Sequence, residues 1–336
     1  LTIVRTPTYK SNNLRIHKNS SPPILGGLRP RPPERRIAMK TAPTKTPKWK
    51  HHPAVTVTSA NEIRKIDRDT YYGWEEIIAF VKNLQPNIKI FSDAGPDVHW
   101  IGNEKGFAGA TFWSTINTDN LTIGASKTDY LNSGDPEGTQ WIVGQCDVSI
   151  RPGWFYHADQ DSLVKSPQQL ADIYYKSVGR NAILLLNLPP DKRGVIHEND
   201  VKSLTEFKAL IDASLATNLA KGQTASANNY RLKHSKFGPQ NTLDGDPTTY
   251  WATDDSVFPA TLEISLTEKT SFDRIMIQEP IHLGQRISQF EIDVMGTEGW
   301  STIEKGTTVG YKRILRIPKV NTHKVRIRIT EANNNV

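Results

Sequence analysis

Residues 90–104, with the sequence IFSDAGPDVHWIGNE, bring acidic and aromatic side chains together in a pattern that suits carbohydrate chemistry. An apolar strand leads into a turn-rich loop that carries three carboxylates and two aromatic rings: Asp93, Asp97, Glu104, His99 and Trp100. Aromatic rings stack on a sugar face, and a carboxylic acid whose pKa is raised by partial burial can protonate a glycosidic oxygen. A solvated turn with capping aspartates is the simpler alternative.

The length and composition favour two folded units and no membrane span. With 336 residues the chain exceeds one average domain. No apolar run reaches the length of a bilayer-spanning helix, and LLLNL at 184–188 is interpreted as a buried strand. Cys146 is the single cysteine, which excludes an intrachain disulfide. Because it lies in an apolar strand, we expect a packed thiol and not a nucleophile.

The basic excess of the chain lies in its first 53 residues. The formal net charge is +7, but this stretch holds twelve basic residues and one acid, so the remainder is slightly acidic. Residues 1–54 also hold nine of the 21 prolines and almost no periodic apolar pattern, so we expect disorder. A basic arm can bind nucleic acid or an anionic membrane, but the folded part lacks any nucleic-acid-binding motif. A solvated segment is the simpler interpretation.

Residues 55–215 alternate strands and helices. The first helix is expected over 72–84, with one apolar face toward the core: Trp74, Ile77, Ile78, Val81 and Leu84. Further elements follow in the order strand, helix, strand: strands at 88–91, 109–113, 148–150 and 183–188, and helices at 168–178 and 199–215. This order is typical of a (β/α) barrel, in which chemistry takes place on the loops after the strands.

Residues 216–336 have a different pattern. Short alternating strands are separated by turns rich in Gly, Pro, Asn and Asp, and we expect them at 261–266, 274–278, 290–294 and 324–330. This pattern predicts an all-β sandwich after the α/β segment.

Five motifs in the α/β segment resemble the α-L-fucosidases of glycoside hydrolase family 29. They are GATFWSTIN (109–117), SGDPEG (133–138), CDVSIRPGWFYH (146–157), QQLADIYYKSVGRN (168–181) and LLLNLPPDKRGVIHE (184–198). The resemblance is nearly continuous over 71–207 and is closest to the branch that removes α-1,3- and α-1,4-linked fucose. It implies the C-terminal part of a (β/α) barrel whose first half lies upstream in the family.

The resemblance also implies roles for individual residues. The family retains configuration with an aspartate nucleophile and a carboxylic acid that acts first as acid and then as base. Its WIGNE motif matches 100–104, which makes Glu104 the acid/base. Trp100, Trp154 and Phe155 match the aromatic lining of the fucose site. Arg151 either belongs to that site or anchors its loop.

The chain departs from the family pattern where the nucleophile is expected. The family has Phe-Asp-Gly-Ala-Asn there, and this chain has VTSAN at 57–61, with Thr58 at the aspartate position. A threonine hydroxyl without a neighbouring base does not replace a carboxylate as glycosyl acceptor. His99 replaces the usual arginine, and Gly144-Gln145 replaces an Ala-Glu pair. The family's His-His-Asp-Gly-Phe motif is absent, and we interpret Lys50-His51-His52 as coincidence.

The all-β segment resembles a discoidin or coagulation-factor 5/8 C-type jelly roll, used by many carbohydrate-binding modules. The resemblance rests on 218–230, 241–253 and 284–294. Sugar-binding candidates on its loops are Tyr230, His234 and Arg286, while Trp251 and Trp300 suit the core equally well. In the turn DGDPTT, Asp244, Asp246 and Thr249 offer oxygen ligands suited to a structural Ca²⁺, with a metal-free capped turn as the alternative.

Together these features predict a disordered segment at 1–54, a partial barrel at 55–215 and a sandwich at 216–336. The expected function is that of a retaining α-L-fucosidase acting on fucosylated glycans, in a catalytically incomplete form and without a catalytic cofactor. The alternative is a non-catalytic, lectin-like protein. The family implies an extracellular or lysosomal location, although the chain shows no signal peptide. The sequons at Asn19 and Asn120 permit glycosylation there.

Overall fold

A computed structural model of the chain describes residues 1–5, 72–124, 127–334 and 336. The expectations for the rest of the basic segment and for Thr58 lie outside the described residues. Thr2–Val4, expected to be disordered, instead form strand β1, which pairs with the sandwich strand β9. Ile3 and Val4 are buried there, so two apolar side chains are enough to place this short strand on the sheet.

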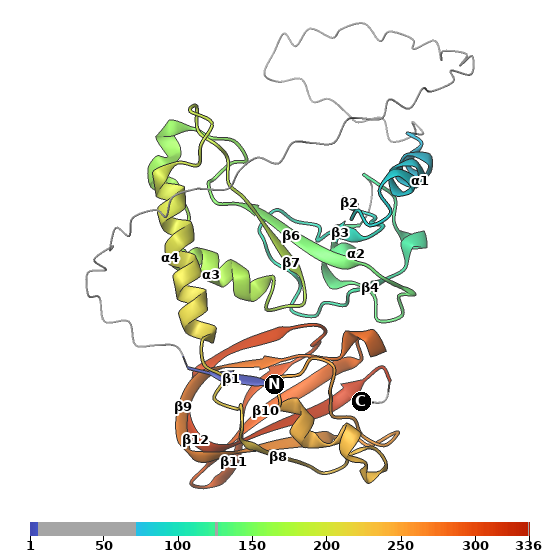
Figure 1. Cartoon of the computed structure of the whole chain (residues 1–336), viewed down its shortest axis with the longest axis vertical. Helices are drawn as coiled ribbons and strands as arrows, with labels where there is room; N and C mark the ends of the chain where they lie inside the picture. The colour runs from blue at the N-terminus through green and yellow to red at the C-terminus, as the bar shows by residue number, and fades with distance from the viewer. Residues whose placement is uncertain (6–71, 125–126, 335) are drawn as a thin grey trace, which may run out of the picture. The chain divides into compact units, whose positions relative to one another are not determined.

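The α/β segment contains a four-stranded parallel sheet in the order β2, β3, β6 and β7 (Figure 1). Its strands are Phe91–Ser92, Val98–Trp100, Val143–Ser149 and Ile183–Asn187. The helices are α1 (Trp74–Leu84), α2 (Thr128–Ser133), α3 (Pro167–Lys176) and α4 (Glu198–Leu215). The 3-10 helices η1 (Thr118–Asn120) and η2 (Ala158–Leu163) and the antiparallel pair β4 (Thr115–Ile116) and β5 (Gln140–Trp141) complete the segment.

Local signals explain where the main helices begin. Ser166 and Gln169 form a capping box in front of α3, and Pro167 occupies its first turn. His197 caps α4, because its Nδ1 accepts a hydrogen bond from the backbone N–H of Asn199. Both helices therefore begin within one residue of their predicted starts.

Three expectations for this segment are wrong. The strand expected at 88–91 covers only Phe91 and Ser92, and residues 88–90 form no strand. Residues 109–113 form no strand; their backbone is held by side chains of the sandwich, and β4 begins only at Thr115. In addition, α1 contains no buried residue, and Trp74, Ile77 and Leu84 of its apolar face are exposed. Apolar periodicity predicted this helix correctly, but not what covers it.

The C-terminal segment is a six-stranded antiparallel sheet wrapped around one core. Besides β1, its strands are β8 (Thr224–Ala227), β9 (Ala260–Ile277), β10 (Ile287–Gly296), β11 (Gly299–Gly306) and β12 (Arg313–Ala332). Four 3-10 helices lie in its loops: η3 (Arg231–Lys233), η4 (Ser235–Phe237), η5 (Pro239–Thr242) and η6 (Ile281–Leu283). The strands predicted at 261–266 and 274–278 are parts of one long strand, β9, which pairs with β12 on both sides of two register shifts.

The barrel segment and the sandwich contact each other through buried hydrogen bonds and through apolar packing. Gln285 of the sandwich accepts hydrogen bonds from the Ser114 backbone N–H and the Asn181 side chain, and donates one to the Phe112 carbonyl. On α3, Tyr175 packs with Ile314 of β12 in a small buried cluster. The two segments therefore belong to one compact unit.

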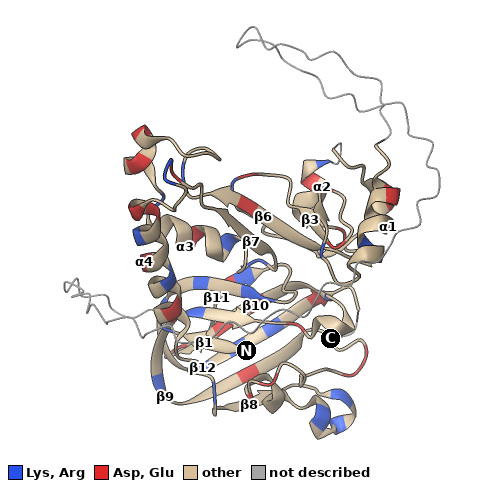
Figure 2. Cartoon of the chain, turned by 45° about the horizontal axis from the view of Figure 1, so that its top comes forward, with Lys and Arg blue, Asp and Glu red and all other residues tan. Residues whose placement is uncertain are grey.

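Charge is mixed along the described helices and strands. In the view of Figure 2, basic and acidic residues are interspersed along α3, α4 and the sandwich strands. This distribution does not resemble the one-sided basic face of a nucleic-acid-binding domain. Among the described helices, none is long and apolar enough to cross a bilayer.

Candidate active site

Glu104 lies on a turn that the WIGNE sequence itself builds. Ile101 is fully buried and fixes the end of β3 in the core. Gly102 has φ +87°, and a Cβ there would approach the Thr128 carbonyl oxygen to 2.5 Å, so only glycine fits. The Asn103 side chain then bonds the Phe107 carbonyl and the Lys105 backbone N–H. These contacts leave the Glu104 side chain exposed at the carboxyl end of the sheet.

Trp154 reaches Glu104 from the loop after β6. Its indole Nε1 donates a hydrogen bond of 2.9 Å to Glu104 Oε2. The Trp154 carbonyl accepts one of 3.0 Å from the side chain of Asn187, which also contacts Ser149. Because Ser149 and Asn187 pair in register at the ends of β6 and β7, the structure brings the predicted residues Glu104 and Trp154 together at one edge.

A second carboxylate, Asp147, lies near this pair. Trp100 Nε1 donates a hydrogen bond of 2.8 Å to Asp147 Oδ1. Burial, and to a lesser degree the charge of Glu104, raises the pKa of Asp147 above its ordinary value. Asp147 and Asn187 were not among the predicted site residues. Asn187 lies near the end of the strand predicted at 183–188, where barrel chemistry is expected, whereas Asp147 precedes the strand predicted at 148–150 and lies near the end of β6 only because that strand begins at Val143.

The other two acids of the loop have structural partners. Asp97 forms an ion pair of 2.6 Å with Lys82 on α1 and accepts the backbone N–H of Ile90; these contacts lower its pKa. Asp93 accepts a hydrogen bond from the Gly124 backbone. These contacts fit the simpler interpretation of capped turns, and Glu104 is the acid that contacts an aromatic donor of the site.

His99 faces the core. It is fully buried, its Nδ1 contacts the Trp100 carbonyl, and its Nε2 has no partner. Burial lowers its pKa, which favours the neutral ring. Gly144 pairs with His99 in the sheet, and a Cβ there would approach the Phe112 ring to 2.5 Å. The glycine therefore makes room for the histidine and phenylalanine rings.

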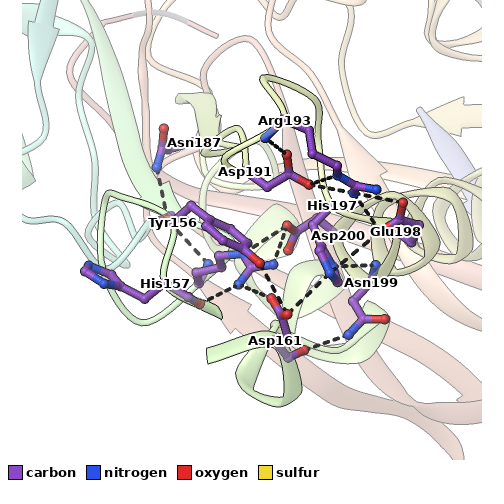
Figure 3. A network of polar contacts seen from close by, with 12 residues as sticks. Tyr156, His157, Asp161, Asn187, Asp191, Arg193, His197, Glu198, Asn199 and Asp200 are labelled. Atoms are coloured by element: carbon purple, nitrogen blue, oxygen red, sulfur yellow. Dashed lines mark hydrogen bonds and ion pairs between the residues drawn. The ribbon is translucent and has the colours of Figure 1, made fainter. Parts of the chain in front are cut away.

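Arg151 anchors the loop that carries Trp154. Its guanidinium is fully buried and bonds Asp200 of α4 and Asp161, each at 2.9 Å. Burial would lower the pKa of Arg151, but these two carboxylates outweigh that effect and raise it. Asp161 also contacts Tyr156 and His197 at 3.3 Å (Figure 3). Of the two predicted roles for Arg151, the structure fits the anchoring one.

The remaining candidates of this segment divide into exposed and buried. Phe155 is 78% exposed beside Trp154, which leaves its ring free for a ligand. Cys146 is buried, and burial raises the pKa of its thiol to about 12. At neutral pH it is therefore a packed thiol, as expected.

Of the sandwich candidates, Arg286 lies in a hollow. It lines a pocket of about 770 Å³ together with Arg231, Tyr250, His282 and Tyr311. Tyr230 and His234 do not line this pocket. Trp251 packs against the sandwich core, and the Arg326 guanidinium stacks 4.3 Å from the ring centre of Trp300.

The DGDPTT turn closes on itself. Asp244 accepts hydrogen bonds from the Asp246 backbone and from the Thr249 hydroxyl, and Asp246 accepts two from Thr248. Within the described residues, no group of three or more His, Cys, Asp or Glu side chains could hold a metal. The arrangement is that of a capped turn whose hydroxyls would have to turn away to admit calcium, and calcium binding stays a prediction.

A parallel sheet with a carboxylate and indole pair at its carboxyl edge, joined to a β-sandwich, fits the C-terminal part of a glycosidase barrel with an appended module. Residues 71–213 match the family model described as alpha-L-fucosidase, and 223–336 match the F5/8 type C domain. The chain therefore belongs to the α-L-fucosidase family over 71–213 and carries an F5/8 type C domain behind it.

Individual relatives agree with this assignment. Alpha-L-fucosidase 1 of Arabidopsis thaliana is 42% identical over 257 residues, which are 76% of this chain and 50% of that protein. The crystal structure of SpGH29 is 39% identical, with a TM-score of 0.75 over 79% of this chain and 57% of that one. A Ruminococcus gnavus GH29 fucosidase, solved in complex with fucose, is 30% identical, with a TM-score of 0.72 over 83% and 57% of the two chains. The chain thus spans about half the length of the plant relative.

Proposed function

We propose that this chain provides the acid/base half of a retaining α-L-fucosidase site that releases terminal α-linked L-fucose from glycans. The observation that carries the proposal is the contact between Glu104 and the Trp154 indole at the carboxyl edge of the sheet. A carboxylate that is solvent-accessible yet held by an aromatic neighbour can exchange a proton with a glycosidic oxygen and with water.

The chain's own residues suggest how a substrate is held. Asn187 fixes the Trp154 backbone, and Arg151 fixes the loop behind it, so the indole is preorganised. The exposed Phe155 ring offers an apolar surface to the methyl group and apolar face of fucose. Trp100 is oriented by Asp147. Glu104 then donates its proton to the leaving oxygen and later deprotonates the water that completes hydrolysis.

Retention needs a second carboxylate about 5 Å from the first as nucleophile. By sequence, Thr58 stands at the nucleophile position, and a threonine hydroxyl does not serve there. We therefore propose that the chain by itself is catalytically incomplete. Activity is expected once the aspartate strand of the family is supplied.

The role of Glu104 can be tested in a chimera. In the chimera, the half of the Arabidopsis relative outside the match replaces the residues ahead of residue 71. The variant Glu104→Gln is then compared with the control Glu137→Gln, which changes another exposed glutamate of the same segment. Glu104→Gln should lower kcat/KM on fucosylated oligosaccharides by at least about 100-fold and spare aryl fucosides, because a phenolate leaves without protonation. Equal loss on both substrates would remove Glu104 from the acid role.

Sugar binding by the sandwich is a second candidate function, favoured by the pocket that Arg286 lines. Two arginines, a histidine and two tyrosines there combine hydrogen-bond donors with aromatic faces. Titration of the full chain with fucosylated oligosaccharide should give binding that Arg286→Ala and His282→Ala weaken and Glu104→Gln leaves unchanged. Binding that follows Glu104 and ignores both sandwich variants would assign it to the barrel segment.

We also propose an extracellular or lysosomal location, where fucosylated glycans are degraded. The exposed sequon residue Asn120, at the end of η1, supports this proposal because it is accessible to glycosylation. A mobility shift on glycosidase treatment of the chain from its natural host, lost in Asn120→Gln, is the corresponding observation. An unshifted chain would argue for another compartment.

A further inference from the structure

Two stretches of the sandwich, 278–287 and 309–311, line its pocket on one side and contact the barrel segment on the other. Every residue of these stretches lines the pocket except Gln285 and Gly310. Those two residues lie in contact with the barrel segment instead. One wall of the pocket and part of the contact between the two segments are therefore built from the same backbone.

Asn181 of the barrel segment contacts both stretches. It lies between α3 and β7, is 7% exposed and has a φ of +66°, a conformation that asparagine adopts more readily than most residues. Its Nδ2 donates a hydrogen bond of 3.2 Å to Gln285 Oε1, and its Oδ1 accepts one of 2.8 Å from the Tyr311 backbone N–H. A Cβ on Gly310 would lie 2.3 Å from the Asn181 carboxamide, so the second stretch packs directly on this group.

Glu279 ties the two stretches to each other inside the sandwich. Its buried carboxylate accepts backbone N–H groups from Arg286 at 2.7 Å, Ile287 at 3.0 Å and Gly310 at 2.5 Å. Its own backbone N–H donates to the Gly310 carbonyl at 2.8 Å. Because a buried carboxylate needs these donors, the two stretches do not move independently. The side chains of Arg286 and Tyr311, which line the pocket, therefore follow the position of both stretches.

We propose that Asn181 is a positioning residue for the sandwich pocket, so that the barrel segment sets the place of the wall that presents Arg286 and Tyr311. The ligand is the one of the second candidate function above, a fucosylated sugar, and that part of the inference rests on it. A ligand in the pocket contacts stretches that Asn181 holds. Its binding therefore stabilises the contact between the two segments, and that contact in turn raises the affinity for the ligand.

Native-state hydrogen exchange of the full chain tests the positioning role without any ligand. Asn181→Gly keeps the left-handed backbone and removes both side-chain contacts, so the amides of 286–287 and 310–311 should exchange at least about tenfold faster. Asn181→Asp keeps an oxygen acceptor for the Tyr311 N–H but replaces the donor to Gln285 with a second oxygen. In this variant only 286–287 should exchange faster.

Asp172→Asn is the matched control. It breaks an ion pair of 2.6 Å with Arg316, which also joins α3 to the sandwich but lies outside both stretches, and it should leave their exchange unchanged. Unchanged exchange in Asn181→Gly, or an equal acceleration in Asp172→Asn, would overturn the proposal. Thermal unfolding shows whether each variant is folded at the temperature of the measurement. If Asn181→Gly is not, wild-type exchange at 286–287 in Asn181→Asp overturns the proposal by itself.

Titration of the full chain with fucosyllactose adds the ligand. Asn181→Gly should weaken the dissociation constant at least about tenfold, because the wall of the pocket is no longer held in place, and Asp172→Asn should leave it unchanged. Binding by Asn181→Gly as tight as that of the wild type would overturn the positioning role. Faster exchange in Asn181→Gly without any sugar binding by the wild type would retain that role and count against sugar binding by the sandwich.

Discussion

Two indole N–H groups each meet a carboxylate at the carboxyl edge of the sheet, and the two carboxylates have different environments. Glu104, bonded by Trp154, is exposed. Asp147, bonded by Trp100, is partly buried. On the proposed function, the exposed acid exchanges protons with substrate and water, while the partly buried acid orients the Trp100 ring. Environment therefore assigns the two carboxylates different roles.

Asp147→Asn tests the cost of the buried charge. Burial first, and then the charge of Glu104, raise the folded-state pKa of Asp147, so its ionised form costs folding free energy at neutral pH. That cost vanishes as the pH falls below the unfolded value of about 4. The variant keeps an acceptor for Trp100, and its Tm should exceed that of the wild type by about 1–3 °C at pH 7 and equal it at pH 3. A lower Tm at pH 7 would contradict this.

At this scale the sequence predicted residues that stand inside long motifs. Glu104 and Trp154 are examples, and the structure places them in contact. Asp147 and Asn187 were missed because each lies within a strand, and strand periodicity does not say which side chain meets a neighbouring loop. The calcium role of Asp244 and Asp246 stays a prediction.

The loop over 151–161 depends on one buried arginine. Arg151 is held by Asp200 and Asp161, and its ring contact with Tyr156 measures 4.7 Å from the guanidinium carbon to the ring centre. Figure 3 shows the surrounding contacts reaching Asp191, Arg193 and Glu198. An ion pair between Arg151 and Asp200 therefore joins the loop to the start of α4.

Asp200→Asn should destabilise the fold by about 3 kcal/mol, because it leaves a buried cation short of one charged partner. Asp212→Asn on the same helix removes an exposed ion pair with Lys208 and should cost no more than about 0.5 kcal/mol. Urea unfolding of both variants gives the comparison. Equal effects of the two substitutions would mean that the anchor adds nothing beyond a surface pair.

At the scale of elements, prediction succeeded where local signals decide. The capping box at Ser166 placed the start of α3 within one residue and its end within two, and the apolar run at 183–188 gave β7 its bounds within one residue. It failed at 109–113, where GATFW has strand propensity but its backbone is bonded by Thr308 and Arg313 of the sandwich. Such contacts link residues 196 and 203 positions apart, and propensity carries no information about them.

At the scale of the molecule, the sandwich and the barrel segment are joined through Gln285. Gln285→Ala removes three buried hydrogen bonds and leaves the Ser114 N–H and the Phe112 carbonyl unsatisfied. We expect a loss of about 2–4 kcal/mol in the free energy of unfolding. The exposed Gln289→Ala is the matched control and should change it by less than about 0.5 kcal/mol. A loss below 1 kcal/mol for Gln285→Ala would show that the contact is dispensable.

The sequence predicted that a barrel segment comes first and a sandwich second, because the repeat of apolar residues changes near residue 216 from the alternation of helices and strands to short strands alone. The contact between the two segments was not predictable, because Gln285 and Thr308, which form it from loops of the sandwich, look like ordinary turn residues in the sequence. Nor did the sequence indicate that residues 2–4 add a strand to the sandwich from the far end of the chain. These features depend on long-range pairing, which periodicity within a window does not report.

We propose that this chain holds the acid/base of an α-L-fucosidase site and, by its sequence at Thr58, lacks the nucleophile. The most direct test compares hydrolysis of an aryl α-L-fucoside by the purified 336-residue chain and by the chimera that restores the aspartate strand. We expect at most a trace rate for the chain alone, and turnover on the order of 10 per second for the chimera. Turnover on that scale by the chain alone, or an inactive but folded chimera, would contradict it.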